Sequence, residues 1–243
     1  MRRRRGGERC GHDEDRAVPF GGVRDVLRVV GPRRFITEVV PWAVRLRYVF
    51  YALALPAAAR PLLLDGFRLD LATDADLPLF VAARPERYTL PMLTQRLRDG
   101  HLAFVGRVGA AVAHLRWVFT RTVNVPYLGR RIVLAGGDVL LDEIYTMPAW
   151  RRRGVEGAVA VAMPRMLHAM GYRRILCAIA SWNLAPQRVA AAHGYERLGS
   201  GGYWALPGLR RYFWEGMVED RPDGTLVLGR WADVGRERRE AVV

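Results

Sequence analysis

The feature that most constrains this chain is a junction at residues 138–160, DVLLDEIYTMPAWRRRGVEGAVA. Its first nine residues, 138–146, are mostly apolar and are typical of a strand, which Pro148 ends. After the arginine run, apolar residues recur from Val155 at the three- and four-residue spacing of a helix. The junction therefore predicts a strand that leads through a short turn into a helix.

A junction of this kind can hold an anion. The first amides of a helix have no carbonyl partner within the helix, and they all point the same way. Gly154 and Gly157 remove side chains that would keep a phosphate away from the backbone. The arginines at 151–153 add charge and forked donors suited to phosphate oxygens. The pattern fits neither a Walker loop nor a dinucleotide fingerprint, so a phosphate cradle and a solvated basic turn both stay open.

The chain of 243 residues has a formal net charge of +14, and every basic residue is an arginine. Such a charge attracts polyanions, which include nucleotide cofactors, nucleic acids and anionic membranes. Outside the C-terminal tail no basic face is interleaved with aromatic residues, so we expect no nucleic-acid partner.

The two cysteines, Cys10 and Cys177, lie in a polar leader and in an apolar run, which argues against a structural disulfide. The leader has no apolar segment after its basic start, so it is not a secretory signal. The most apolar run, residues 48–59, has 12 residues and is too short for a spanning helix. We therefore expect a soluble, cytoplasmic protein.

The N-terminal extension carries a stripe of apolar residues at helical spacing after Pro41. The stripe is formed by Trp42, Leu46, Val49, Phe50 and Leu53. Three roles stay open for it: packing on the chain's own core, pairing in a homodimer, and peripheral membrane contact through residues 41–56. The predicted organisation is a disordered basic leader at 1–20, a helical extension at 21–65, a main domain at 66–217 and a charged tail at 218–243.

Within the main domain, patterning and turn residues predict alternating strands and helices. The strands are expected at 67–73, 101–108, 110–119, 131–137, 138–146, 173–180 and 210–217, and the helices at 73–83, 89–100, 155–170 and 183–194. A further strand is predicted in the tail at 225–228.

Residues 139–195 resemble the acetyl-CoA-binding core of the GNAT-type N-acetyltransferases. LDEIYTMPAWRRRGVEG matches their strand, proline and Arg/Gln-x-x-Gly-x-Gly/Ala pattern with Arg151 and Gly154, but Glu156 replaces the last small residue. NLAPQRVAAAHGY matches a second signature with Asn183, Gly194 and Tyr195. The order of elements is similar to that of the family over about residues 66–217.

The resemblance implies an α/β (α+β) fold: a mixed, mostly antiparallel sheet of six to seven strands flanked by helices, here with a helical N-terminal extension. It also implies acetyl-CoA as co-substrate and no metal. In the family, the strand holding residues 144–146 diverges from the strand holding 175–180, and the pantetheine arm lies between them. The implied cofactor-binding residues are Ile144, Tyr145, Thr146, Arg151, Arg152, Arg153, Gly154, Val155, Glu156, Gly157 and Asn183. Asn183 is also a candidate helix cap.

The family's usual general base is a carboxylate on the strand beside the cofactor, and Asp142 and Glu143 are the candidates. Strict alternation would separate the two side chains, but a bulge, common in this strand of the family, can reverse that choice. We expect the pair, with Glu143 preferred, to supply the base. The alternative is that both are ordinary charges or salt-bridge partners. The family's acid, a tyrosine, is replaced by Ala190, which leaves Tyr195 and Tyr203 nearest in sequence.

The predicted function is an N-acetyltransferase that moves an acetyl group from acetyl-CoA to a primary amine by direct attack. The acceptor is a small molecule or a peptide, shaped by residues 84–100, 120–130 and 196–210. The alternative is an acyl-CoA-binding module with weak or no turnover and a regulatory or scaffolding role.

Overall fold

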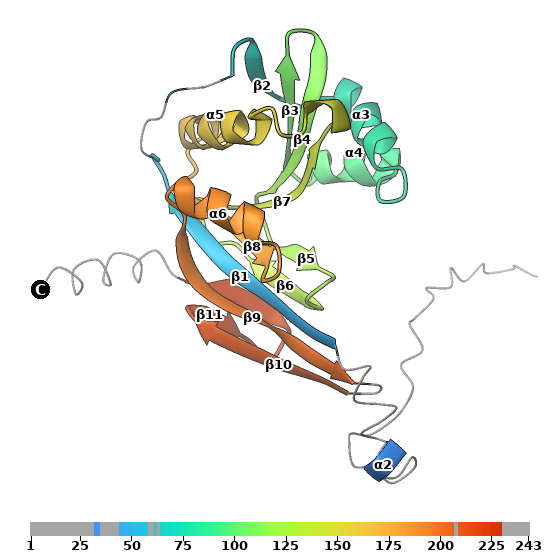
Figure 1. Cartoon of the computed structure of the whole chain (residues 1–243), viewed down its shortest axis with the longest axis vertical. Coiled ribbons are helices and arrows are strands. Elements are labelled where there is room, and N and C mark those ends of the chain that lie inside the picture. The colour runs from blue at the N-terminus through green and yellow to red at the C-terminus, as the bar shows by residue number, and fades with distance from the viewer. Residues whose placement is uncertain (1–31, 35–43, 58–60, 62–63, 207–208, 230–243) are drawn as a thin grey trace, which may run out of the picture. The chain divides into compact units, whose positions relative to one another are not determined.

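The computed structural model describes residues 32–34, 44–57, 61, 64–206 and 209–229 (Figure 1). The chain divides into two compact units, Met1–Arg45 with Trp204–Arg211, and Leu46–Tyr203 with Tyr212–Val243. In the first unit, α2 (Pro32–Arg34) is a single turn, and the Arg45 guanidinium lies 4.8 Å from the centre of the Trp204 ring. The candidate site lies in the second unit.

The main sheet has eight strands among the described residues. In spatial order they are β10 (Leu209–Gly216), β9 (Glu196–Leu206), β1 (Val44–Ala54), β8 (Arg174–Ala180), β7 (Asp138–Thr146), β4 (Ala111–Phe119), β3 (Leu102–Val108) and β2 (Phe67–Leu71). The pairs β1–β8, β2–β3, β3–β4 and β4–β7 are antiparallel, whereas β7 and β8 are parallel. The sheet is therefore mixed and mostly antiparallel, as predicted.

A second sheet of four strands has the order β11-β12-β6-β5. Its members are β5 (Val123–Val125), β6 (Arg130–Val133), β11 (Val218–Asp220) and β12 (Thr225–Leu228). The predicted strand in the tail is confirmed as β12, which pairs in parallel with β6. Residues beyond the predicted end of the main domain at 217 therefore belong to the folded structure.

Four helices pack against the main sheet within the described ranges. They are α3 (Leu77–Ala83), α4 (Leu90–Arg98), α5 (Val155–Ala169) and α6 (Leu184–Ala192), with single 3₁₀ turns at η3 (Asp74–Asp76) and η4 (Pro148–Trp150). Figure 1 shows α3 and α4 on one side of β3 and β4 and α5 on the other. The α5 positions Val155, Val159, Met163 and Leu167 recur every fourth residue and are all buried, which fits the predicted helical stripe.

The predicted helical extension at 21–65 is wrong for residues 44–54. Residues 44–54 form β1, which pairs antiparallel with β8 from Tyr48 opposite Ala180 to Ala54 opposite Arg174. A strand buried on both faces is an almost continuous apolar run, and such a run contains helical spacings by chance. Val49 and Leu53 are buried on one face and Phe50 on the other, so they offer no exposed stripe for a membrane. Trp42 lies outside the described residues, as do the predicted leader at 1–20 and residues 21–31.

The strand β9 was not predicted, because its sequence ERLGSGGYWAL is rich in glycine and resembles a loop. Two of its glycines allow neighbouring strands to approach its backbone closely. A Cβ at Gly202 would lie 2.0 Å from the Leu46 carbonyl oxygen, and one at Gly201 would lie 1.9 Å from the Trp214 ring. Residues 196–206, which we expected to shape an acceptor loop, therefore form a strand, and β1 and β9 raise the strand number above the predicted six to seven.

Candidate active site

The candidate site lies where β7 and β8 part. The two strands pair in parallel only from Asp138 opposite Arg174 to Leu141 opposite Cys177. Beyond Leu141, β7 keeps β4 on one edge and has no strand on the other among the described residues. The predicted divergence of these strands is confirmed. It leaves Ile144, a residue in the middle of a sheet, 46% exposed.

A buried ion pair holds the paired end of these strands together. The Arg174 side chain is 2% exposed and donates through Nε to Asp138 Oδ1 at 2.9 Å, while its Nη2 donates to the other carboxylate oxygen. The same guanidinium donates to the Gly229 carbonyl and, at 3.2 Å, to the Leu228 carbonyl. A buried charge is tolerated when its donors are satisfied in this way.

At the parted end, β7 contains the predicted bulge. Trp117 of β4 lies opposite Asp142 and Arg116 lies opposite Ile144, so Glu143 is an extra residue between two paired positions. Glu143 has a φ of 52°, which is unusual for a residue with a side chain. The bulge redirects the Glu143 side chain relative to strict alternation, which is what such irregularities do near functional sites.

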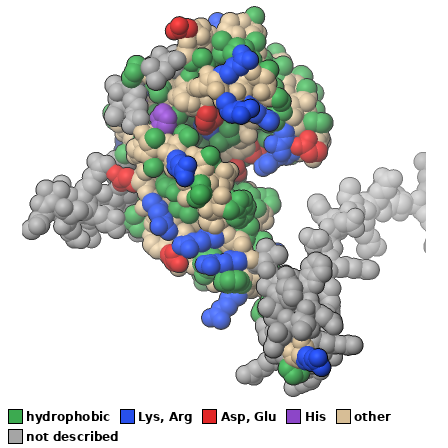
Figure 2. All heavy atoms as spheres, viewed as in Figure 1, with side chains coloured by type: hydrophobic (Ala, Val, Ile, Leu, Met, Phe, Trp, Pro, Cys, Tyr) green, Lys and Arg blue, Asp and Glu red, His purple; other side chains and the backbone are tan. Residues whose placement is uncertain are grey.

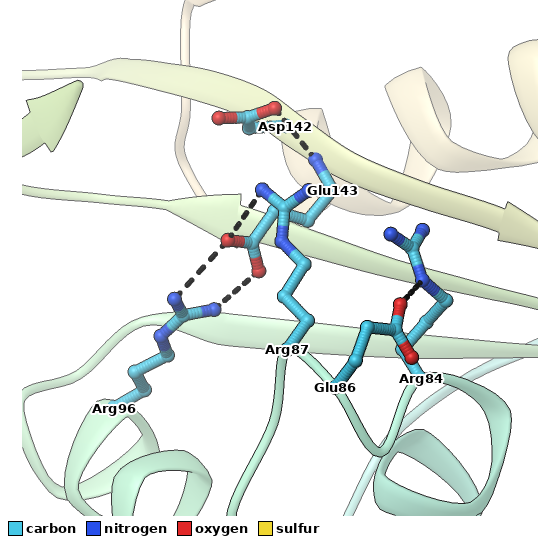
Figure 3. Close-up of polar contacts among 6 residues, drawn as sticks. All are labelled: Arg84, Glu86, Arg87, Arg96, Asp142 and Glu143. Carbon is cyan, nitrogen blue, oxygen red and sulfur yellow. Dashed lines mark hydrogen bonds and ion pairs between the residues drawn. The ribbon is translucent and has the colours of Figure 1, made fainter. Parts of the chain in front are cut away.

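Glu143 is held by two arginines (Figure 3). Arg96 of α4 donates from Nη2 to Glu143 Oε1 at 3.1 Å and from Nη1 to Oε2, and Arg87 Nη2 lies 3.2 Å from Oε1. Burial alone would raise the pKa of Glu143, but the bonds and charges of Arg96 and the charge of Arg87 bring it below its usual value. A carboxylate held in this way is a weak proton acceptor.

Asp142 has different hydrogen-bond partners and a different pKa shift from Glu143. Its Oδ1 accepts a hydrogen bond from the Glu143 backbone N–H at 2.7 Å, and Figure 3 shows its carboxylate apart from Arg87 and Arg96. Among the described residues it makes no ion pair. Burial raises the pKa of Asp142, and the neighbouring Glu143 charge acts in the same direction. Of the two predicted carboxylates, Asp142 is therefore the one with the basicity that a proton acceptor needs.

The arginine turn leads into α5 with its amides open. Arg152 and Gly154 have positive φ angles of 60° and 79°, and Gly154 precedes the first helical residue, Val155. The Ala158 N–H donates to the Gly154 carbonyl at 3.0 Å, which is the first bond of the helix. Within the part of the chain that the structure describes, no backbone carbonyl accepts from the amides of 152–157. These amides and the positive end of the helix dipole form a ready anion site.

The two glycines of this turn leave space above the amides. Among the described residues, a Cβ built at Gly154 or at Gly157 would meet no atom within 4 Å apart from the backbone next to it. Gly154 needs to be glycine because of its positive φ. Gly157 has no such need, since it lies in an ordinary helical turn that alanine would stabilise. The open space at Gly157 would admit a group that approaches the helix from outside, such as a diphosphate.

The three arginines have different surroundings. Arg151 Nε donates to the Thr146 carbonyl at 3.2 Å, and its guanidinium lies 5.8 Å from the centre of the Tyr145 ring. The Arg153 guanidinium lies 5.5 Å from the centre of the Trp150 ring. Arg152 is exposed and has no partner among the described residues. The three arginines are exposed at consecutive positions of the turn, which places positive side chains there.

Glu156, which departs from the family pattern, turns inward. Its Oε1 accepts from Arg116 Nη2 at 2.6 Å and its Oε2 lies 3.7 Å from His114 Nδ1, which also lies 3.0 Å from Thr146 Oγ1. Burial alone would raise the pKa of Glu156, but Arg116 and His114 lower it, while burial lowers the pKa of His114 to about 4. The Glu156 charge is thus matched by Arg116 and does not confront an anion at the turn.

Sequence reasoning did not assign this contact to Arg116 or His114. The only signal was two polar residues at alternate positions of an otherwise apolar strand, AHLRWVF, which places both side chains on one face of β4. Both are buried. Their partner Glu156 follows only from the tertiary structure.

The second signature, at residues 183–195, covers α6 and the residues on either side of it. Asn183 stands at the N-cap of α6, but its side chain makes no capping hydrogen bond. Ala190, at the place of the family's tyrosine, is buried against Val49 and Tyr51 of β1. The Tyr51 hydroxyl donates to Gln187 Oε1 at 3.1 Å. Burial raises the pKa of Tyr195 above its usual value, so this phenol is a weak proton donor.

No protein-family model and no curated protein matches the chain. Solved structures do. A protein from Novosphingobium aromaticivorans assigned to the GNAT acetyltransferase family matches with a TM-score of 0.45 and 13% identity over 65% of this chain and 63% of its own. The match thus spans less than two thirds of that protein.

Two enzymes of known substrate also match. The ribosomal-protein-S18-alanine N-acetyltransferase from Escherichia coli has a TM-score of 0.43 and 13% identity over 54% of this chain and 77% of its own. An aminoglycoside N-acetyltransferase in complex with CoA has a TM-score of 0.42 and 20% identity over 53% and 91%. These neighbours are acetyltransferases. At such identities and scores the likeness concerns the fold.

In the described ranges, no helix combines the length and the apolar character needed to cross a bilayer.

Proposed function

We propose that the chain is an acyl-CoA-dependent N-acyltransferase that transfers an acetyl group from acetyl-CoA to a primary amine. The observation that carries the proposal is the set of open amides at 152–157, which lie directly after the strand that parts from β8. The diphosphate of the co-substrate would be held by these amides and by Arg151, Arg152 and Arg153. Its arm would run along the unpaired edge of β7 at Ile144, Tyr145 and Thr146.

The co-substrate supplies an activated acetyl group as a thioester. The acceptor enters as an ammonium ion, and Asp142 takes a proton from it, directly or through one water, and passes that proton to solvent. The free amine then forms the C–N bond as the C–S bond breaks. The second amine proton ends on the departing sulfur, so that the products are an N-acetyl amine, CoA as a thiol and one proton in solution.

We propose Asp142 as the base in place of Glu143, although Glu143 is the preferred residue on sequence grounds. The two carboxylates differ in their partners: Glu143 is paired with Arg96 and Arg87, whereas Asp142 accepts one backbone hydrogen bond. Glu143 then has a positioning role, because its ion pairs fix the bulge that orients Asp142.

A second candidate function is a CoA-binding module without turnover. The observation that favours it is Ala190, which is buried at the place where the family has its acid, beside a Tyr51 hydroxyl already bonded to Gln187. Both candidates require the diphosphate site, and only the first requires release of CoA.

Binding is tested by titrating the full chain with CoA in a calorimeter. Arg152→Glu combined with Arg153→Glu should lower CoA affinity by about a hundredfold, because it replaces two favourable charges at the turn with two repulsive ones. The control is Arg98→Glu combined with Arg121→Glu, which makes the same change in net charge at exposed positions away from the turn. Equal losses in both double variants would reduce the effect to net charge and refute the site.

Turnover is tested by following free CoA thiol with acetyl-CoA and a panel of primary amines. Release that depends on the amine supports the acyltransferase. Tight CoA binding without release for any amine would favour the binding module.

A further inference from the structure

Three aromatic side chains from distant parts of the sequence meet beside the parted strands, and we call them the aromatic cluster. They are Tyr48 of β1, Tyr127 of the β5–β6 turn and Trp182 of the turn after β8. The Tyr48 and Tyr127 rings stack with 4.5 Å between their centres and 26° between their planes. The Trp182 ring meets Tyr48 edge-on at 6.0 Å.

The exposure of Trp182 is unusual for a side chain in such a cluster. It is 62% exposed, whereas other large aromatic side chains, such as Trp117 and Phe50, are buried. A tryptophan that contacts another ring while showing most of its surface to solvent is typical of a recognition surface. Close to it in sequence, Leu184 is also exposed, at 56%.

The aromatic cluster lies on the same face of the sheet as Asp142. Tyr48 and Tyr127 pack against the core cluster that contains Leu140, and Asp142 follows Leu140 by two residues along β7. The Asp142 charge is also among the causes that raise the pKa of both tyrosines, which requires it to be near them.

The charges around this place limit what an acceptor can carry. Glu143 is matched by Arg87 and Arg96, and Glu86 is matched by Arg84 at 2.6 Å. Asp142 is then the one carboxylate of this region that lacks an ion-pair partner among the described residues. A polycation needs several unpaired carboxylates, and Arg84, Arg87 and Arg96 would repel it. The charges therefore fit an acceptor with a single ammonium group.

We propose that the acceptor is a monocationic arylalkylamine, whose aromatic ring packs on Trp182 and Tyr48 while its ammonium group faces Asp142. The inference rests on the proposed function, because it names the acceptor class of that reaction. Aromatic rings attract another ring by edge-to-face or offset contact, and a nearby cation is attracted to their faces.

The test compares three amines in the CoA-release assay and in calorimetric titrations of the CoA-loaded chain. They are 2-phenylethylamine, the saturated analogue 2-cyclohexylethylamine and the polycation spermidine. We expect 2-phenylethylamine to exceed the saturated analogue about fivefold in kcat/KM and in affinity, and spermidine to be the poorest of the three. In Trp182→Leu that fivefold advantage should disappear, and Trp204→Leu, which changes an exposed tryptophan elsewhere, should keep it.

The failures of the two proposals are distinguishable. If CoA is released equally with all three amines, or if Trp182→Leu keeps the preference, the acceptor inference is overturned and the acyltransferase stands. If CoA is released with none of them, the titrations decide the acceptor inference. A fivefold preference for 2-phenylethylamine that depends on Trp182 would support the aromatic site, and equal or absent binding would overturn it.

Discussion

The two ends of the β7–β8 pair differ in how their backbone and their charged side chains are paired. At one end, Asp138–Leu141 pair in parallel with Arg174–Cys177, and a buried ion pair with further bonds to two carbonyls closes the end. At the other end, Asp142–Thr146 have no partner on that edge within the described ranges, Glu143 is bulged, and Ile144 is exposed.

The strand β7 is thus held by pairing at one end, while its backbone stays unpaired on one edge at the other end. At one end of the parallel pair, Asp138 and Arg174 are buried and must pair with each other. Their ion pair fixes the register of β7 up to the bulge. Beyond the bulge, unpaired backbone and unbonded amides stay available for a ligand. The charges at the two ends differ too, because Asp138 is paired with Arg174 whereas Asp142 makes no ion pair with a described residue. Figure 2 shows arginine side chains spread over one face of the molecule.

The largest effect is expected from breaking the closed end. In Asp138→Ala the Arg174 guanidinium stays buried without its carboxylate, so the free energy of unfolding should fall by about 3–5 kcal/mol. Urea denaturation of the full chain measures this. As a control, Glu219→Ala removes an exposed ion pair to Arg221 and should leave stability close to that of the wild type. A loss for Asp138→Ala no greater than that of the control would mean that the ion pair does not hold this end.

At the open end, Asp142→Asn should lower kcat/KM for an amine by about a hundredfold, because it removes the proton acceptor. Glu143→Gln keeps Asp142 and should cost less than about tenfold. The pKa of Asp142 is raised, so its carboxylate forms at a higher pH than that of an ordinary aspartate, and the wild-type rate should rise with pH through that raised pKa. A Glu143 carboxylate with a lowered pKa is already ionised there and cannot produce the rise.

The same raised pKa has a consequence for stability. The native state holds the Asp142 proton more tightly than the unfolded chain, so unfolding free energy should fall as pH rises from the ordinary carboxyl pKa through the raised one. The Asp142→Asn variant should lack that fall. A rising rate limb that persists in this variant would assign the base to another group.

The smallest effect is expected from a substitution at the arginine turn. In Gly157→Leu a side chain enters the open space above the amides, and CoA affinity should fall about tenfold, or about 1.4 kcal/mol. Stability should stay the same or rise by up to about 1 kcal/mol, because glycine is a poor residue within a helix. Gly136→Leu, also at a position with no atom within 4 Å, should leave CoA affinity unchanged. Thermal unfolding and calorimetry measure both quantities, and unchanged affinity in Gly157→Leu would place the diphosphate elsewhere.

Much of the site could be predicted because its signals are local. The strand at 138–146, the arginine turn and the helix from Val155 follow from patterning within a few residues of one another. The bulge was anticipated from the family resemblance, but the partners of Glu143 were not, because Arg96 lies 47 residues away and reaches it only through the packing of α4. The choice of proton acceptor between the two carboxylates depends on those partners, so the structure favours Asp142 where the sequence favours Glu143.

The sequence alone determined the strands β2, β3, β4, β7 and β8, the helices α3 to α6 and the amide turn, because backbone geometry and side-chain periodicity are set by near neighbours. Only the tertiary structure decided that 44–54 is a central strand and that Glu156 turns inward to Arg116. It likewise brought Tyr48, Tyr127 and Trp182 together. Each of these outcomes depends on contacts between residues far apart in the chain, whose energies exceed the local preferences that would have placed them otherwise.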